Sequence, residues 1–281
     1  MSVPTLRLRR FNPRIIEEKR LAGSPPTIVV IGKRGTGKST LIKDLLYEIQ
    51  NIPMVIGMSG TEEGNGFYGK YIHPLCVHND YKPEITSNII KQQKIKVKRL
   101  QKDGIDPRSR PDIGVGLLLD DCGYDKKIFK EKDIREIFMN GRHFQICLML
   151  SLQYMMGMPP DLRTNIDYVF CLRDNITANQ KRLYDYFFGC FKKFAHFQEA
   201  FAECTDNYSC LVLDNTAKST KIEDCVFHYK ANPDRVFKIG SRELWAMLNQ
   251  RLKDEEENED DDDYNKQTKQ TQKLVVIKKK I

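Results

Sequence analysis

A glycine-rich loop near the start of the chain has the residue types and the spacing that bind phosphate. Gly32 is followed by four residues and then by Gly37-Lys38-Ser39, the pattern of a phosphate-binding loop. Glycines let such a loop turn its backbone N–H groups toward phosphate, the lysine reaches the outer phosphates, and the serine hydroxyl can bind magnesium. We predict that this loop binds the phosphates of a nucleotide through Gly32, Lys33, Arg34, Gly35, Thr36, Gly37, Lys38 and Ser39.

Two adjacent aspartates end an apolar run farther along the chain, where residues 116–121 read GLLLDD. A strand that ends in a polar turn would give the same letters, but a phosphate loop requires a magnesium-binding acid on a neighbouring strand. A second acid can orient and deprotonate the attacking water. We therefore predict that Ser39 and Asp120 bind Mg²⁺ and that Asp121 activates water.

Gln153 follows a further apolar run, LMLSL at residues 148–152. Where an extra strand lies between the phosphate loop and the acids, a polar residue at its end can sense the γ-phosphate and couple it to movement. A glutamine at a strand end is weak evidence by itself, since such positions are often only solvated. The order of loop, acids and polar strand end favours a sensor at Gln153.

The elements that must position these residues alternate along the chain. Short apolar, β-branched runs predict strands, and amphipathic stretches at 41–49, 87–102 and about 126–140 predict helices between them. This alternation predicts an α/β fold with a mostly parallel sheet and helices on both faces, extended at its edge by strands near the C-terminus. The predicted strands are residues 27–31, 54–58, 115–120, 145–151, 168–172, 209–214 and 225–230.

Composition and charge set the domain boundaries, and they exclude a membrane-spanning chain and a small protein that depends on disulfides. With 281 residues and 40% hydrophobic residues, the chain can bury a core without disulfides, and no apolar run approaches the ~20 residues that span a bilayer. The eight cysteines form no Cys-x-x-Cys pair, which favours reduced buried thiols over a zinc site. We predict a basic arm at residues 1–24, an ATPase domain at 25–252, ending in a helix at 241–252, and a disordered tail at 253–281 that is acidic and then lysine-rich.

The net charge of +8 understates how basic the predicted domain is, because all but one of residues 254–263 are acidic. A basic body favours an anionic partner, nucleic acid before membrane. The tail could compete with that partner for the same surface, or it could be a solvated end without such a role.

Six blocks of sequence, taken in order, resemble the genome-packaging ATPases of nucleocytoplasmic large DNA viruses, a branch of the FtsK and HerA superfamily of P-loop translocases. The similarity extends from about residue 25 to about residue 240, and six ordered blocks are more specific than the phosphate loop alone. The blocks are GKRGTGKST, SGTEEGNGFYGKYI (59–72), LLLDDCGYD (117–125), MNGRHFQICLMLSLQY (139–154), LRTNIDYVF (162–170) and YSCLVLDNTAKS (208–219).

This resemblance implies a RecA-like ATPase that assembles as a hexameric or pentameric ring and drives double-stranded DNA into a capsid. It maps ATP binding onto the phosphate loop and extends that loop by one residue, to Thr40. It implies the host cytoplasm as the location, at the viral factory or with the virion, and a capsid or vertex protein as a partner. The wider superfamily usually has glutamate at the position of Asp121, so Glu63 is a second candidate base. Ring ATPases usually complete the site with an arginine of the neighbouring subunit, for which Arg142 is our first candidate and Arg163 our second.

A DNA translocase also needs clustered basic side chains that contact backbone phosphate rather than bases. The predicted helix at 87–102 carries such a cluster, and a solvated helix face is an equally good interpretation. The candidate DNA contacts on this helix are Lys91, Lys94, Lys98, Arg99 and Lys102.

Other classes of protein use the same loop. A GTPase is disfavoured because no Asn/Thr-Lys-x-Asp motif, which would recognise guanine, follows a later strand. A small-molecule kinase stays open, although no acceptor lid is evident and the paired acids suit water activation better. A structural protein of the particle that binds nucleotide only to order a ring also stays open.

Overall fold

The computed structural model describes residues 6–122, 126–155 and 157–254. The chain divides into two compact units, Met1–Gly240 and Ser241–Ile281. The second unit begins with a helix that includes residues 242–254, where the sequence predicted a helix at 241–252. That helix belongs to its own unit and not to the end of the predicted ATPase domain. The rest of the predicted tail, residues 255–281, lies outside the described residues.

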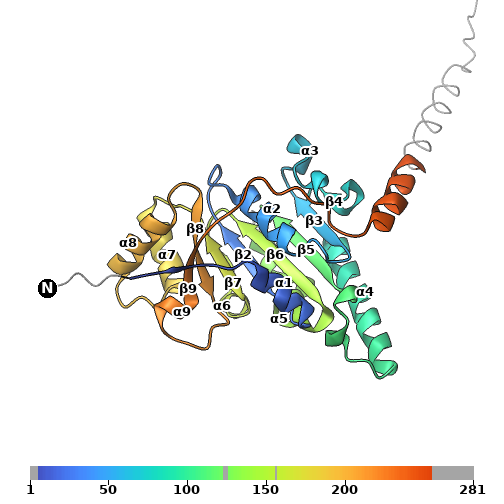
Figure 1. Cartoon of the computed structure of the whole chain (residues 1–281), viewed down its shortest axis with the longest axis horizontal. Coiled ribbons are helices and arrows are strands. Elements are labelled where there is room, and N and C mark those ends of the chain that lie inside the picture. Colours follow the sequence, from blue (N-terminus) through green and yellow to red (C-terminus); the bar gives the residue numbers. More distant parts are fainter. Residues whose placement is uncertain (1–5, 123–125, 156, 255–281) are drawn as a thin grey trace, which may run out of the picture. The chain divides into compact units, whose positions relative to one another are not determined.

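One mixed sheet organises the first unit (Figure 1). In the part of the chain that the structure describes, nine strands follow the order β1-β9-β8-β7-β2-β6-β5-β3-β4. β8 runs antiparallel to β7 and β9, and the other neighbouring pairs are parallel. The strands are β1 (Arg9–Arg10), β2 (Thr27–Ile31), β3 (Val55–Ser59), β4 (Val77–His78), β5 (Val115–Asp120), β6 (Ile146–Leu152), β7 (Tyr168–Cys171), β8 (Ser209–Asp214) and β9 (Val226–Lys230).

All seven predicted strands are present, each within one residue of its predicted ends. β6 lies between β2 and β5, which confirms the extra strand expected between the phosphate loop and the acids. Because β2, β5 and β6 are parallel, their carboxyl ends meet at one edge of the sheet, where an open α/β sheet binds ligands. The phosphate loop, the two aspartates and Gln153 are therefore brought to the same edge.

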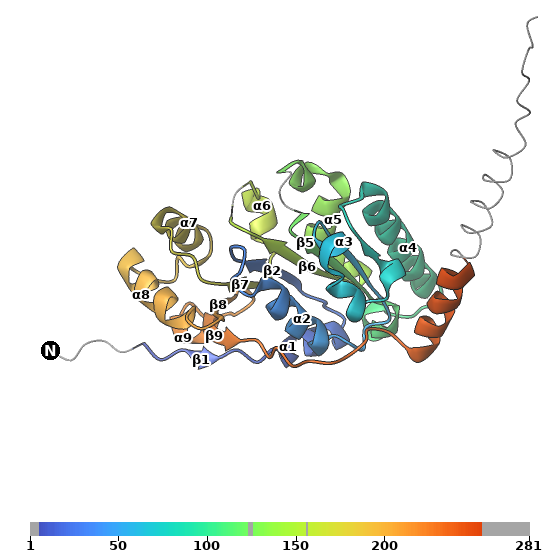
Figure 2. The ribbon, with the colours of Figure 1, turned by 90° about the horizontal axis from the view of Figure 1, so that it is seen from above.

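Helices cover both faces of the sheet, as predicted, with α1 and α2 on one side and α4 and α5 on the other (Figure 2). Alternate side chains of a buried strand point to opposite faces, so Val29 and Ile31 enter the core cluster that contains residues of α4 and α5. The helices of the first unit are α1 (Arg14–Leu21), α2 (Lys38–Glu48), α3 (Glu62–Asn65), α4 (Pro83–Lys102), α5 (Lys132–Asn140), α6 (Pro160–Arg163), α7 (Thr177–Phe187), α8 (Phe194–Cys204) and α9 (Ile222–Cys225). Among the described helices, none has both the length and the apolar character that a membrane span requires.

The segment after β9 is hydrogen-bonded to α2, the helix that carries Lys38 and Ser39. Asp44 of α2 is fully buried, and its carboxylate accepts hydrogen bonds from Arg235 at 2.8 Å and from the backbone N–H of Asn232 at 2.9 Å. Tyr229 of β9 donates a further hydrogen bond to the same carboxylate. A buried carboxylate is stable only when its oxygens are paired in this way, so Asp44 joins α2 to this segment.

The predicted arm at residues 1–24 differs from what the structure shows. Its described part is not a separate arm, because it contributes β1 and α1 to the first unit. Phe11 is buried with its ring edge-on to Tyr168 and Phe170, and Ile16 of α1 is buried. Arg20 is also buried, and its guanidinium pairs with Glu17 through two hydrogen bonds of 2.6 Å. Helix α1 could not be predicted from the sequence, because a short helix that buries an arginine has no sustained apolar period.

Candidate functional site

The phosphate loop connects β2 to α2 through two glycines in the left-handed region of backbone conformation, Gly35 with φ of 79° and Gly37 with φ of 95°. Other residues adopt this region only at a cost. A Cβ at Gly32 would lie 2.7 Å from Oγ1 of Thr36, so that position also requires glycine. The Thr36 hydroxyl donates to the carbonyl oxygen of Lys33 at 2.7 Å and closes the turn. The loop is thus shaped to present backbone N–H groups at the start of α2, where a helix favours anions.

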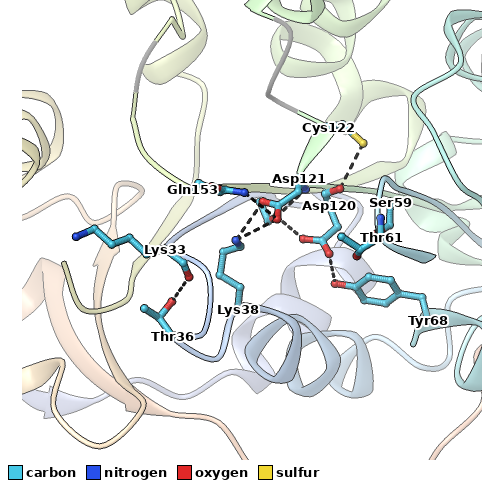
Figure 3. Close-up of polar contacts among 11 residues, drawn as sticks. Lys33, Thr36, Lys38, Ser59, Thr61, Tyr68, Asp120, Asp121, Cys122 and Gln153 are labelled. Atoms are coloured by element: carbon cyan, nitrogen blue, oxygen red, sulfur yellow. Dashed lines mark hydrogen bonds and ion pairs between the residues drawn. The ribbon is translucent and has the colours of Figure 1, made fainter. Parts of the chain in front are cut away.

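Lys38 and Asp121 face each other at the carboxyl edge of the sheet (Figure 3). The Lys38 Nζ atom lies 3.1 Å from Oδ1 of Asp121, and Lys38 is 7% exposed. Gln153, directly after β6, donates its amide N–H to Oδ2 of Asp121 at 3.4 Å. Asp121 has φ of 53°, a strained value for a non-glycine residue. The structure therefore brings together the predicted lysine, base and sensor, which come from three separate elements.

Asp120 lies beside this group but is buried, with 3% of its surface exposed. The Ser151 hydroxyl donates to its Oδ1 atom, and the Tyr68 hydroxyl donates to its Oδ2 atom at 2.9 Å. Burial raises the pKa of Asp120, while the hydrogen bonds from Ser151 and Tyr68 oppose that rise. The backbone N–H of Asp121 in turn donates to the Ser151 hydroxyl at 3.0 Å. One buried serine thus holds both aspartates in place.

The predicted magnesium ligands fit one cation. The Tyr68 hydroxyl donates to Asp120 at 2.9 Å, and Ser39 is close enough to the same hydroxyl to affect the pKa of Tyr68, so the two predicted ligands lie near each other. Burial raises the pKa of Tyr68 well above its usual range, and the phenol therefore stays protonated as a donor. A serine hydroxyl and a carboxylate are oxygen ligands of the kind that Mg²⁺ prefers. A bound cation would also stabilise the buried negative charge of Asp120.

Tyr68 is placed by the segment after β3. Glu62 of α3 is buried, and its carboxylate accepts the backbone N–H groups of Tyr68 at 3.0 Å and of Gly69 at 2.8 Å. Two charge-assisted hydrogen bonds fix the backbone at the base of the tyrosine. The alternative base, Glu63, is the next residue but is exposed. The described contacts thus bring Asp121, and not Glu63, to Lys38.

The two candidate arginines lie away from this group. Arg142 is in the short 3₁₀ helix Gly141–Phe144 that precedes β6, at the amino edge of the sheet. Its guanidinium lies 3.9 Å from the carboxylate of Asp167, which directly precedes β7. Arg163 ends α6, and its guanidinium lies 3.8 Å from the ring centre of Tyr186. Arg142 thus lies at the edge of the sheet opposite the phosphate loop, whereas the described contacts of Arg163 are with Tyr186 and the carbonyl oxygen of Met158.

The predicted DNA-binding face of α4 is mostly exposed. Lys94 departs from that prediction, because its ammonium group pairs with Glu136 of α5 at 2.5 Å and lies over the ring of Phe144. Ile90 and Val97 form part of the buried face of α4, which explains why Lys94 points toward α5. The remaining candidates are exposed, namely Lys91, Lys98, Arg99 and Lys102.

Sequence reasoning missed the two residues that hold Asp120. Ser151 left a readable signal, because it is a polar residue inside the apolar strand β6, two positions before Gln153. A buried hydroxyl in such a strand needs a partner. Tyr68 left no comparable signal beyond its place in the block at 59–72.

A phosphate loop between a buried strand and a helix, with paired acids at the end of a neighbouring parallel strand, defines a P-loop NTPase fold. Residues 14–184 match the Poxvirus A32 protein family, and the chain belongs to that family, which confirms the family resemblance. An uncharacterized protein of Acanthamoeba polyphaga mimivirus is 38% identical over 228 residues, which cover 79% of this chain and 78% of that protein. An uncharacterized protein of Invertebrate iridescent virus 6 is 40% identical over 209 residues, which cover 74% of this chain and 77% of that protein.

Two solved structures are similar to this chain at low sequence identity, and the first of them shows the shared fold. The pCW3 conjugation coupling protein TcpA, in its monomer form with ATPγS, has a TM-score of 0.53 and 12% identity, with 82% of this chain and 70% of that chain covered. The genome packaging NTPase of Sulfolobus turreted icosahedral virus 2, in complex with AMP, has a TM-score of 0.49 and 16% identity, with 74% of this chain and 98% of that chain covered.

Proposed function

We propose that this chain is a magnesium-dependent ATPase that moves double-stranded DNA into a viral capsid as one subunit of a homo-oligomeric ring. The convergence of Lys38, Asp121 and Gln153 at the end of the phosphate loop carries the enzymatic part of the proposal. Membership of the Poxvirus A32 protein family supports the packaging part. We place this activity in the host cytoplasm, at the viral factory or on the virion, with a capsid or vertex protein as the docking partner.

The chemistry follows from the contacts of Asp121. Its carboxylate accepts a hydrogen bond from Gln153 and pairs with Lys38, and a bound triphosphate would offer Lys38 a stronger anionic partner. Asp121 would then be free to accept the proton of a water attacking the γ-phosphate. Magnesium held by Ser39 and Asp120 would neutralise charge that develops on the phosphates. Gln153 connects this event to β6, so the state of the phosphate can reach the rest of the sheet.

In a ring, Arg142 would act on the nucleotide of a neighbouring subunit, a role that it does not have within its own subunit. The arginine lies at the amino edge of the sheet, opposite the carboxyl edge that holds the loop. It could therefore complete only the site of a neighbouring subunit, where a planar cation would stabilise the transition state. Arg163 is the second candidate for the same role.

The DNA part of the proposal rests on the exposed basic residues of α4. Lys91, Lys98 and Lys102 follow one another at intervals of seven and four residues, which places them along one side of the helix. Side chains of this kind bind backbone phosphate without reading bases. Lys94 is excluded from this surface because it pairs with Glu136.

The test is charge reversal on α4. We expect Lys91→Glu, Lys98→Glu and Lys102→Glu together to abolish the stimulation of ATP hydrolysis by long double-stranded DNA, because each reversal replaces a phosphate contact with repulsion. Hydrolysis measured without DNA should stay near that of the unchanged chain. The matched control reverses three lysines that are exposed elsewhere on the unit, Lys181→Glu, Lys192→Glu and Lys193→Glu, because it changes the net charge by the same amount. Stimulation that survives the triple change on α4 would refute the assignment of this surface.

A further inference from the structure

The loop before β8 lies beside the phosphate loop. Because β8 is antiparallel to β7, the start of β8 at Ser209 lies at the edge of the sheet where β2 and β7 end. A Cβ added to Gly37 would lie 3.3 Å from Cδ1 of Tyr208. The Tyr208 ring is therefore next to the glycine that precedes Lys38.

Tyr208 lies on the other side of the phosphate loop from the acids. The order β8-β7-β2-β6-β5 places the loop of β2 between the acid strand β5 on one side and β8 on the other. The outer phosphates belong at Lys38 and Asp121, on the side of β5 and β6. The nucleoside end of the same ligand must then extend away from those strands, and Tyr208 stands on that side.

Burial does not account for the position of this tyrosine. Tyr208 is 68% exposed, the highest value among the aromatic residues that the structure describes as exposed. It has φ of 60°, and Asn207 before it has φ of 49°. Asparagine tolerates this left-handed conformation, but tyrosine does so at a cost of about 1 kcal/mol or more. The loop thus adopts a strained backbone conformation in which an aromatic ring is exposed to solvent beside the phosphate loop.

The loop that carries the ring is held at both ends. The backbone N–H of Ser209 donates to the carbonyl oxygen of Asp206 at 2.9 Å, which closes the turn around Asn207 and Tyr208. The carboxylate of Asp206 pairs with Arg173, after β7, at 2.6 Å. Asp174, the next residue, pairs with Lys33 of the phosphate loop at 2.8 Å. The tyrosine loop, the end of β7 and the phosphate loop therefore form one connected set.

We infer that Tyr208 is the platform on which the base of the bound nucleotide stacks. This inference rests on the proposed nucleotide site and adds the base-binding part of it. A flat aromatic ring supplies stacking to any base, and the contact needs no hydrogen bond from the phenol. The site should then favour purine over pyrimidine nucleotides through stacking area, with little distinction between ATP and GTP from Tyr208 itself.

Calorimetric titration of the full chain with two probes in the presence of magnesium separates the base from the phosphates. The probes are ATP and inorganic tripolyphosphate, which has the phosphates and no base. We expect Tyr208→Ala to weaken ATP binding roughly tenfold, within the 1–3 kcal/mol of a stacked base, and to leave tripolyphosphate binding unchanged. Tyr208→Phe should retain ATP binding, since stacking needs only the ring. Thermal unfolding should be nearly unchanged, because the side chain is exposed.

Each other outcome overturns the inference in a distinguishable way. ATP binding that is unchanged in Tyr208→Ala would remove the base platform and leave the phosphate site intact. Equal weakening of ATP and tripolyphosphate would show that Tyr208 only supports the shape of the phosphate loop. If the unmodified chain bound neither probe, the proposed nucleotide site would fail together with the inference.

Discussion

The two sides of the phosphate loop are built in opposite ways. On the side of β5 and β6, Lys38 and Asp120 are buried, and the polar side chains contact one another (Figure 3). On the side of β7 and β8, Arg173, Asp206 and Tyr208 are exposed, and the backbone of the tyrosine loop is strained.

This difference matches the two ends of a nucleotide. Charge that changes during a reaction is best stabilised by fixed dipoles and ions in a water-excluded site, which describes the side of Asp120 and Asp121. A base undergoes no chemistry and needs only a surface that it can reach and leave. The comparison therefore assigns chemistry to the buried side and recognition to the exposed side, and each side can be changed separately.

The largest expected effect on ligand binding comes from Lys38→Ala, which removes the cation of the buried side. Affinity for both ATP and tripolyphosphate should fall by roughly ten- to a hundredfold, since a hydrogen bond to a charged group contributes about 1.5–3 kcal/mol. Calorimetric titration measures both affinities. The matched control is Lys43→Ala in α2, because that lysine is also buried and donates to the carbonyl oxygen of Pro233 instead of contacting the acids. Tripolyphosphate binding that survives Lys38→Ala would contradict the assignment of the phosphates to this side.

A smaller effect is expected from Tyr68→Phe, which removes the hydroxyl that donates to Asp120. The carboxylate loses one of the two hydrogen bonds that orient it, a loss of about 1 kcal/mol. The magnesium concentration that half-saturates ATP binding should therefore rise roughly fivefold. Tyr71→Phe is the control, because the Tyr71 ring stacks on Phe237, away from the acids. An equal shift in both variants, or none in Tyr68→Phe, would remove Tyr68 from the magnesium site.

Much of the fold could be predicted because its strands are buried on both faces and appear as continuous apolar runs. The strand order near the acids followed from the motif order, and β6 does lie between β2 and β5. Regions that depend on tertiary contacts could not be predicted. The helices α7 and α8 pack through aromatic residues such as Phe188 and Phe197, and no regular period marks them.

The residues of the candidate site likewise fall into those that the sequence predicts and those that depend on tertiary contacts. Lys38, Asp121 and Gln153 could be predicted because each ends or begins an element at a recognisable position, and the structure places them together. The partners of Asp120 could not, since Tyr68 reaches it from 52 positions away. Lys94 was predicted as a DNA contact from helical spacing alone, which does not indicate that α5 offers Glu136 as a partner.

The most direct test of the account is the rate of ATP hydrolysis by the purified full chain, with and without long double-stranded DNA, beside the Asp121→Asn variant. We predict that DNA raises the rate of the unchanged chain several-fold. Asp121→Asn should lower the rate by a factor on the order of 10² to 10⁴ in both conditions, because it removes the base and keeps the shape of the side chain. Hydrolysis that ignores DNA, or that persists in Asp121→Asn, would contradict the account.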